Sequence, residues 1–183
     1  MGKYRTIVAD PPWQYDEGFP SGVGRERRWT TELPYSGMKL DDIKALPVSS
    51  MADAEGARLF LWTTNKYLRA AFDVMDSWGF RYGQTITWHK TGCPPPFPTS
   101  IAPQHSEYLL YGSRGKPGKR QEAFPSTVIA APQQTRHSAK PEVFLDLIER
   151  LSPGPYVELF ARRARFGWDY WGNESLGTAE MAA

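Results

Sequence analysis

The stretch from Thr6 to Trp13 constrains the fold more than any other part of the chain. It opens with the apolar run Thr6-Ile7-Val8-Ala9, which is followed at once by Asp10 and two prolines. Such a run predicts a buried strand, and the prolines end it in a rigid turn because they fix φ and lack an N–H. Open α/β sheets keep their binding sites at the carboxyl ends of such strands. The sequence therefore predicts a site that begins at Asp10.

The turn Asp10-Pro11-Pro12-Trp13 presents hydrogen-bond acceptors. Neither proline has a backbone donor, so a ligand meets carbonyl oxygens and the Asp10 carboxylate. Acceptors suit an amino group, and Trp13 adds an aromatic face of the kind that holds an unstacked base. The turn is thus suited to a nucleobase with an exocyclic amine. Taken alone, these four residues fit an ordinary strand-ending turn with a surface tryptophan equally well.

Apolar runs alternate with helical patterns along the rest of the chain. We expect strands at 5–9, 57–62, 80–88, 105–111, 126–131 and 156–160, with a possible edge strand at 166–171. We expect helices at 39–46, from a cap at Asn65 to Trp78, and at 141–151. The alternation indicates an α/β sheet domain, in which strand 105–111 pairs antiparallel with strand 80–88.

Composition limits the class of protein. A chain of 183 residues with 40% hydrophobic content suits one domain, expected at 1–174, with a disordered tail at 175–183. The single cysteine, Cys93, excludes an internal disulfide, and the three histidines are too scattered to predict a metal site. No apolar run is long enough for a signal peptide or a membrane span. We therefore expect a soluble cytoplasmic protein, from a prokaryote or a virus-infected host cell.

Nucleic-acid binding depends on local clusters, because a net charge of +2 is too small to indicate it. The segment 14–37 interleaves glycines, arginines and Trp29, which favours nucleic-acid contact beside the turn, although a solvated flexible loop is the alternative. Its candidate contacts are Arg25, Arg27 and Arg28. A second basic loop, 112–123, predicts phosphate contact through Lys116 and Lys119, or else an ordinary solvated loop.

The Asp-Pro-Pro-Trp turn resembles the catalytic motif of S-adenosylmethionine-dependent methyltransferases that act on amino groups. Further stretches narrow the resemblance to the MT-A70 family of N6-adenine methyltransferases. In chain order, the matching stretches are VADPPW, ELPYSGM, LFLWTT, HSEYLLYG, HSAKP, LIERLSPG, ELFAR and WGNE. They extend from about Thr6 to Glu174, nearly the whole chain. Single motifs are weak evidence, whereas the ordered set is specific.

The resemblance implies a fold and an activity. The fold is a Rossmann-like methyltransferase sheet with flanking helices, circularly permuted so that the catalytic strand precedes the cofactor strand. The activity is transfer of a methyl group from S-adenosylmethionine to the N6 amino group of adenine, with DNA as the favoured polymer and no metal. Asp10 and the Pro11 carbonyl would accept the two amine hydrogens, and Pro12 and Trp13 complete the motif. Asp10 would also contact the amino group of the cofactor.

The resemblance also implies where the cofactor lies. Within the stretch ELFAR it assigns cofactor contacts to Leu159, Phe160 and Arg162. Lys140 would meet the methionine carboxylate or lie close to the target base. Its position just before a helix suits an anion. The pair Asn173 and Glu174 would bind the ribose hydroxyls and adenine, which suits their donors and acceptors.

The resemblance also points to two residues near the acceptor base, and three alternative functions stay open. Tyr35 resembles the family residue beside the acceptor base, and Glu107 resembles the acidic residue that contacts the acceptor nucleoside. The alternatives are the same reaction on RNA adenine, reaction at N4 of cytosine, and a non-catalytic nucleic-acid-binding subunit with this fold. Because the motif is intact, we expect an enzyme that works as a monomer or homodimer without an obligate partner subunit.

Overall fold

The protein is built on one mixed sheet. The computed structural model describes residues 2–14, 37–92, 102–133 and 139–172. The seven strands of the sheet are β1 (Thr6–Ala9), β2 (Gly56–Thr63), β3 (Arg81–Thr91), β4 (Ser106–Gly115), β5 (Val128–Pro132), β6 (Tyr156–Leu159) and β7 (Trp168–Trp171). Their order is β5-β3-β4-β2-β1-β6-β7, and β4 alone runs antiparallel to its neighbours.

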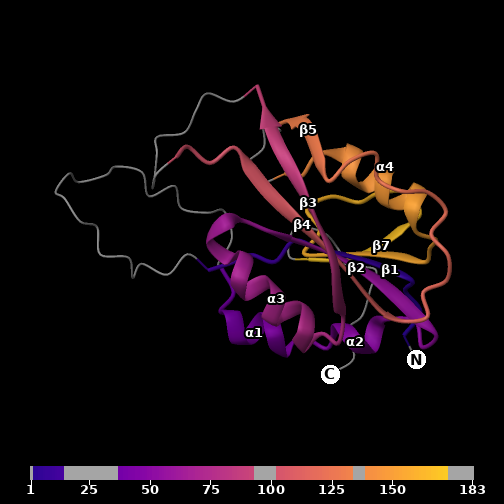
Figure 1. Cartoon of the computed structure of the whole chain (residues 1–183). Helices are drawn as coiled ribbons and strands as arrows, with labels where there is room; N and C mark the ends of the chain where they lie inside the picture. Colours follow the sequence, from indigo (N-terminus) through magenta and orange to yellow (C-terminus); the bar gives the residue numbers. More distant parts are fainter. Residues whose placement is uncertain (1, 15–36, 93–101, 134–138, 173–183) are drawn as a thin grey trace.

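Helices cover both faces of this sheet (Figure 1). The first face carries α1 (Leu40–Ala45), α2 (Val48–Met51) and α3 (Leu68–Ser77), and the opposite face carries α4 (Glu142–Leu151). A 3₁₀ turn, η1 (Asn65–Tyr67), leads into α3. None of the described helices is long and apolar enough to cross a membrane. The layers form the α/β sheet domain that the alternation of strands and helices predicts, and they are consistent with the Rossmann-like methyltransferase fold that the resemblance implies.

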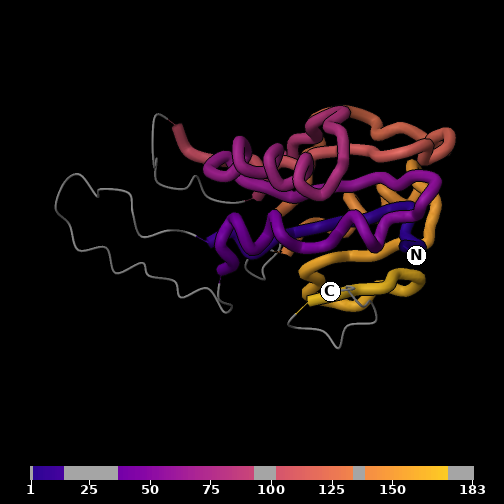
Figure 2. Tube along the Cα trace, turned by 90° about the horizontal axis from the view of Figure 1, so that it is seen from below, coloured from indigo at the N-terminus to yellow at the C-terminus, as the bar shows by residue number. Residues whose placement is uncertain are grey.

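Side chains of β1 alternate between the two cores. Ile7 and Ala9 pack into the cluster under α1 and α3, while Val8 packs into the cluster under α4. All four residues of β1 are buried, because the strand lies between β2 and β6 and is covered on both faces. Figure 2 shows β1 (indigo) running through the middle of the molecule, with the yellow C-terminal strands along one side. The predicted buried strand is therefore confirmed.

The predicted elements are present, but several details differ. The helix expected from a cap at Asn65 begins instead as η1, and α3 starts at Leu68. The cap assignment was wrong: Thr64 and Tyr67 precede the two segments and neither makes a side-chain capping bond. Strand β4 pairs antiparallel with β3 as predicted, and it also pairs with β2. The short helix α2 was not predicted, and the expected edge strand is present as β7.

Candidate active site

The candidate site lies where the parallel strands β1, β2 and β6 end. Because β4 runs the other way, its first residues lie at this edge, with Tyr108 opposite Thr63. The ends of β3 and β4 meet here too, with His89 opposite Ser106. The turn after β1, the turn after β6, the last residues of β3 and the first residues of β4 therefore all lie at the same edge of the sheet.

Backbone bonds fix the turn after β1 on both sides. The Asp10 N–H donates to the Leu159 carbonyl of β6 at 3.3 Å. The Trp13 N–H donates to the Pro11 carbonyl at 2.8 Å, and the Met38 N–H donates to the Pro12 carbonyl at 2.8 Å. Since a carbonyl oxygen has two lone pairs, the Pro11 oxygen retains one acceptor position. The turn is therefore held rigid without using all of its acceptors.

Trp13 is part of the wall rather than an exposed platform. Its side chain is 6% exposed and stacks on Tyr67 with ring centroids 5.5 Å apart. Its Nε1–H donates to the Trp62 carbonyl at 3.3 Å. A cavity of about 420 Å³ lies beside it, lined also by Met38 and Leu40. Because Tyr67 covers one indole face, that face is not available to a base.

A chain of four alternating charges occupies the edge. Lys90 Nζ lies 2.6 Å from Glu107 Oε1, and Lys140 Nζ lies 3.3 Å from Glu107 Oε2. Lys140 Nζ also lies 2.8 Å from Asp10 Oδ2. The four side chains are only 13–17% exposed. The structure thus brings together Asp10, Glu107 and Lys140, three of the residues that the sequence predicts for the site.

The charges in this chain stabilise one another. Burial opposes the negative charge of Glu107, but Lys140 and Lys90 outweigh it and hold the pKa of this carboxyl below its usual value. Burial likewise opposes the positive charge of Lys140, but Asp10 and Glu107 raise its pKa above the usual value. Lys140 is therefore a fixed cation at neutral pH and does not act as a proton acceptor.

Two tryptophans form the floor under the two lysines. Lys140 Nζ lies 5.5 Å from the ring centroid of Trp62, and Lys90 Nζ lies 5.0 Å from that of Trp88. The two indoles meet edge to face at 6.2 Å, and Phe144 of α4 packs against both. Aromatic faces stabilise cations at such distances. Sequence reasoning placed both tryptophans in strands but missed this role, as it missed Lys90.

Glu158 is a further site residue that sequence reasoning missed. It lies on β6 beside Val8 of β1, and none of the described residues forms an ion pair or hydrogen bond with its carboxyl group. Burial and the charge of Asp10 raise its pKa to about 7. An acidic residue inside an otherwise apolar central strand, as in Tyr156-Val157-Glu158-Leu159, is the sequence signal that could have revealed it.

The turn after β6 has an unusual backbone. Phe160 has a φ of 63°, in the left-handed region that a bulky residue rarely adopts, and its ring packs on Trp171. A Cβ on Gly172 would lie 2.6 Å from the Ala161 carbonyl oxygen, so the chain passes this turn closely. Such strain is typical of ligand-binding turns. Leu159 is fully buried, and its carbonyl accepts the Asp10 N–H.

The predicted cofactor residues are only partly described. Arg162 follows the strained turn and is half-buried. Asn173 and Glu174 come directly after Gly172 but lie outside the described residues, as do Tyr35 and the arginines of the first basic loop, Arg25, Arg27 and Arg28. Their predicted roles remain predictions.

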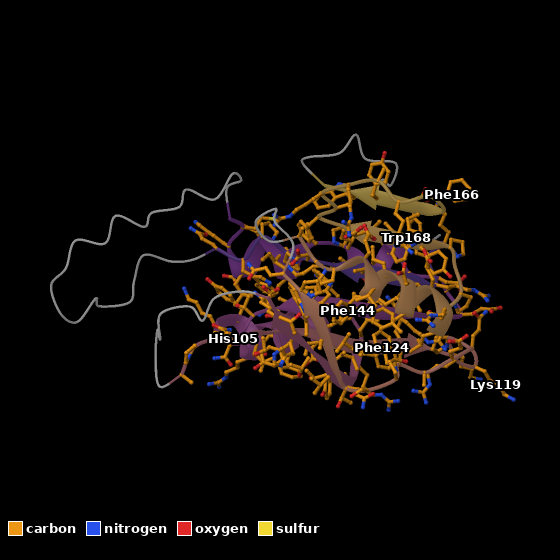
Figure 3. All side chains as sticks on the ribbon, turned by 90° about the horizontal axis from the view of Figure 1, so that it is seen from above. His105, Lys119, Phe124, Phe144, Phe166 and Trp168 are labelled. Atoms are coloured by element: carbon orange, nitrogen blue, oxygen red, sulfur yellow. The ribbon has the colours of Figure 1, made fainter. Side chains whose placement is uncertain are left out.

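The second basic loop lies at the opposite edge of the sheet. Lys116 and Lys119 follow Gly115, the last residue of β4, whereas Glu107 lies near the first. Ten strand residues at about 3.4 Å each separate the two edges by roughly 30 Å. Figure 3 shows His105 and Lys119 at opposite ends of the molecule. These lysines therefore do not contribute to the Asp10 cluster.

Within the described ranges, no group of three or more His, Cys, Asp or Glu side chains is placed to hold a metal ion. The edge instead offers acceptors beside a fixed ammonium group: the Asp10 carboxylate, the Pro11 carbonyl and the Glu158 carboxyl, which pairs with none of the residues that the structure describes. Acceptors in this arrangement can hold an amino group of one ligand and the ammonium group of another.

Comparison with known proteins identifies the family. The model of the MT-A70 family matches residues 4–174. A type II methyltransferase, M.MunI, from Mycoplasma sp is 30% identical over 188 residues, covering 94% of this chain and 78% of that protein. The N(6)-adenosine-methyltransferase catalytic subunit METTL3 of Homo sapiens is 28% identical over 186 residues, covering 97% of this chain and 29% of that protein.

A third relative follows the same pattern. The N(6)-adenosine-methyltransferase MT-A70-like protein of Drosophila melanogaster is 29% identical over 185 residues, covering 97% of this chain and 28% of that protein. The chain thus spans most of the Mycoplasma relative but less than a third of these two animal proteins. The family match, which extends from the start of the sheet to the segment after β7, shows that this protein is a methyltransferase of the MT-A70 family.

Proposed function

We propose that this methyltransferase moves a methyl group from S-adenosylmethionine to the N6 amino group of adenine in nucleic acid, with DNA as the favoured polymer. The observation that carries the proposal is the contact between Lys140 and Asp10 at the carboxyl edge of β1, beside the turn after β6. This contact holds the Asp10 carboxylate in place next to the turn at Phe160, whose backbone lies in the left-handed region. Adenine is favoured over N4 of cytosine by the names of the relatives.

The residues at this edge fit the proposed cofactor. Its methionine part carries an ammonium group, and the Glu158 carboxyl is half-buried, unpaired among the described residues and beside Asp10. At the same turn, Gly172 packs closely on the backbone of Ala161, which brings the segment that leads to Asn173 and Glu174 next to Phe160 and Arg162 in the chain. We assign Glu158 to the ammonium group, and Arg162, Asn173 and Glu174 to the remaining polar groups, as the family resemblance implies.

We also propose that the fold is circularly permuted. The strand with the Asp10 turn and the strand with the Phe160 turn are neighbours in the sheet, although they are the first and sixth strands in sequence. The strand proposed to hold the cofactor therefore follows the catalytic strand in the chain. This order supports the permutation that the family resemblance implies.

The chemistry requires positioned acceptors and no covalent intermediate. S-adenosylmethionine supplies a methyl group on a sulfonium centre. The Asp10 carboxylate and the free acceptor position of the Pro11 carbonyl each take one hydrogen of the amine. The nitrogen lone pair, otherwise delocalised into the ring, would then form a bond to the methyl carbon while the carbon–sulfur bond breaks and its electron pair stays on sulfur, which leaves S-adenosylhomocysteine. The methylated amine would lose its extra proton to solvent, and Lys140 holds Asp10 in place. An adenine in duplex DNA must leave the stack first, at a cost of a few kcal/mol.

DNA is favoured because this chain covers 78% of the type II methyltransferase M.MunI from Mycoplasma sp, far more than of the relatives named as N(6)-adenosine-methyltransferases. A second candidate, RNA adenine, is supported by relatives named as N(6)-adenosine-methyltransferases, of which this chain covers less than a third. The third candidate function is that of a non-catalytic nucleic-acid-binding subunit. It would not need the Lys140–Asp10 contact, which burial makes costly to maintain.

The deciding experiment supplies methyl-labelled S-adenosylmethionine with DNA and, separately, RNA, followed by digestion and mass spectrometry of the nucleosides. We expect labelled N6-methyladenine, mainly from DNA, falling at least about 10²-fold in Asp10→Ala because a preorganised acceptor is lost. Asp73→Ala, which removes an exposed carboxylate on α3, is the matched control. Label from RNA alone would favour the second candidate. Nucleic-acid binding without label, unchanged in Asp10→Ala, would favour the third.

A further inference from the structure

Two adjoining cavities lie on the α4 face, away from the Asp10 edge. The first has a volume of about 190 Å³ and lies between β3, β4 and the segment that leads into β5. Its walls include three aromatic rings, Phe60, Tyr111 and Phe124. Phe60 lies 5.4 Å from Tyr111 and 6.4 Å from Phe124, measured between ring centroids. Drug-sized ligands need about 300 Å³ or more, so this cavity suits a single planar ring system.

The rim of the first cavity offers donors and acceptors to such a ring. Gln84, Ser126 and Thr127 line it together with Arg120. An amide and two hydroxyl groups can each donate and accept, which suits the edge of a heterocyclic base better than a plain hydrocarbon. An aromatic wall with a few placed polar groups is the usual composition of a small-molecule site.

The second cavity is larger, about 620 Å³, and strongly cationic. Three of the six residues that line it are basic: Arg58, Lys119 and Arg120. No Asp or Glu is among the described residues that line either cavity. Such a wall attracts an anion, and the fork of an arginine matches the geometry of phosphate.

Arg58 supplies the independent evidence. It is 1% exposed, and its guanidinium donates to the carbonyls of Pro117 at 3.0 Å and Gly118 at 2.7 Å and to Ser152 Oγ at 3.4 Å. Its Nε has no partner, and none of the described carboxylates forms an ion pair with it. Neutral carbonyls and the nearby end of α4 offset only part of the cost of a buried charge. An anion in the adjoining cavity would complete the compensation.

Tyr111 and Arg120 line both cavities, so one ligand can occupy both. We propose that the two cavities together form a second nucleotide site, with an aromatic base in the first and a phosphate group near Arg58, Lys119 and Arg120 in the second. The ligand is a free nucleotide or a nucleotide unit of the nucleic acid. Tyr111, which lines both cavities, lies four residues along β4 from Glu107, roughly 14 Å at about 3.4 Å per residue. Neither cavity is lined by Asp10, Glu107 or Lys140, so this site is distinct from the proposed acceptor site.

The first test measures the affinity of adenosine monophosphate for the full chain by titration calorimetry. We expect Arg120→Gln and Lys119→Gln, both at exposed positions, to weaken binding at least about tenfold, as loss of a charged hydrogen bond does. Arg69→Gln, at an exposed position on α3 and lining neither cavity, is the matched control and should change the affinity by less than about twofold. Asp10→Ala should have as little effect on this affinity.

Three results would overturn the proposal. The first is no measurable binding of adenosine monophosphate. The second is binding lost in Asp10→Ala but kept in Arg120→Gln, which would place the nucleotide at the Asp10 edge. The third is inorganic phosphate binding as tightly as the nucleotide, because the aromatic cavity would then contribute nothing. The calorimetry needs neither methyl transfer nor cofactor, so it is independent of the proposed reaction.

A second measurement distinguishes the two sources of the ligand. The affinity for a single-stranded oligodeoxynucleotide is compared between the unaltered protein and Arg120→Gln. If both the nucleotide and the oligonucleotide bind more weakly to the variant and compete with each other, the site holds a unit of the nucleic acid. If only the nucleotide is affected, the site serves a free nucleotide.

Discussion

Lys140 Nζ lies 2.8 Å from Asp10 Oδ2, joining residues 130 positions apart in the sequence in one largely buried ion pair. The same ammonium group lies 3.3 Å from Glu107, so one lysine holds two carboxylates apart and in place. Removing one member of such a pair leaves uncompensated charge, whereas removing both members is much less costly. Because of this asymmetry, the interaction energy within the cluster can be measured by comparing single and double mutants.

We expect Lys140→Met to lower the free energy of unfolding at pH 7 by about 3 kcal/mol, because the largely buried Asp10 carboxylate loses the lysine it is paired with, while Glu107 keeps Lys90. Adding Glu107→Gln should restore part of this loss, with a coupling energy of about 1–3 kcal/mol. Urea denaturation of the four proteins in the double-mutant cycle measures it. Strictly additive changes would show that the two residues do not interact.

Lys90 is expected to act as a positioning residue. In Lys90→Met, Glu107 keeps only Lys140 as a partner and draws it away from Asp10. We expect kcat for methyl transfer to fall about tenfold with little change in cofactor affinity, and Lys90→Arg to recover most of the loss. Steady-state kinetics with cofactor titration separates the two effects. Lys44→Met on α1 is the control, and an equal loss there would remove the positioning role.

Glu158 should make folding stability depend on pH. Its pKa in the folded protein is about 7, above the ordinary value near 4.5, so the folded state binds the proton more tightly. The stabilisation is complete below about pH 4.5 and is lost as the pH rises through 7, by at most about 3 kcal/mol. Glu158→Gln should abolish this slope in denaturant titrations between pH 5 and pH 8. An unchanged slope would show that another group causes it.

The same carboxyl should make cofactor binding depend on pH in the opposite direction. If Glu158 binds the ammonium group of the cofactor, the affinity for S-adenosylhomocysteine should rise about tenfold between pH 6 and pH 8, as the carboxyl ionises. Calorimetric titrations at several pH values test this. Glu158→Gln should bind weakly at every pH, and a variant that keeps the rise would exclude this contact.

Gly172→Ala tests the turn after β6. The added Cβ would lie 2.6 Å from the Ala161 carbonyl oxygen and 2.8 Å from its nitrogen, so the chain must shift where it passes the turn. We expect the Kd for S-adenosylhomocysteine to rise at least about tenfold, since misplaced polar partners lose their hydrogen bonds. Unchanged affinity in a folded variant would show that the cofactor does not use this turn.

Much of the fold follows from local sequence. The run before Asp10 reads as a buried strand because it is apolar and ends in two prolines, and the structure places it at the centre of the sheet. The helix after Pro141 reads equally well, because Phe144, Leu147, Ile148 and Leu151 repeat at helical spacing. These two segments are far apart in the sequence, yet the secondary structure of each is specified by its own residues.

The rest depends on strand order, which no local pattern contains. The predicted pairing of β4 with β3 was correct, but its second partner, β2, is far away in sequence. Strand β4 lies between β3 and β2 in the sheet. This position brings Glu107 near the end of β2 on one side and next to Lys90 of β3 on the other. The contact of Lys140 with Asp10 was likewise invisible, because only the assembled sheet sets their distance. Asn65 failed as a helix cap because a 3₁₀ turn occupies that position.

The central place of β1 has a consequence for how the chain is made. Its neighbour β6 comes late in the sequence, so during synthesis β1 emerges long before that side can be paired. Until β6 docks, an apolar strand keeps one row of backbone groups open, which is the arrangement most prone to pairing with another chain. The strand that bears Asp10 is thus the segment that a nascent chain most needs to protect, and the active-site edge is among the last parts of the molecule to assemble.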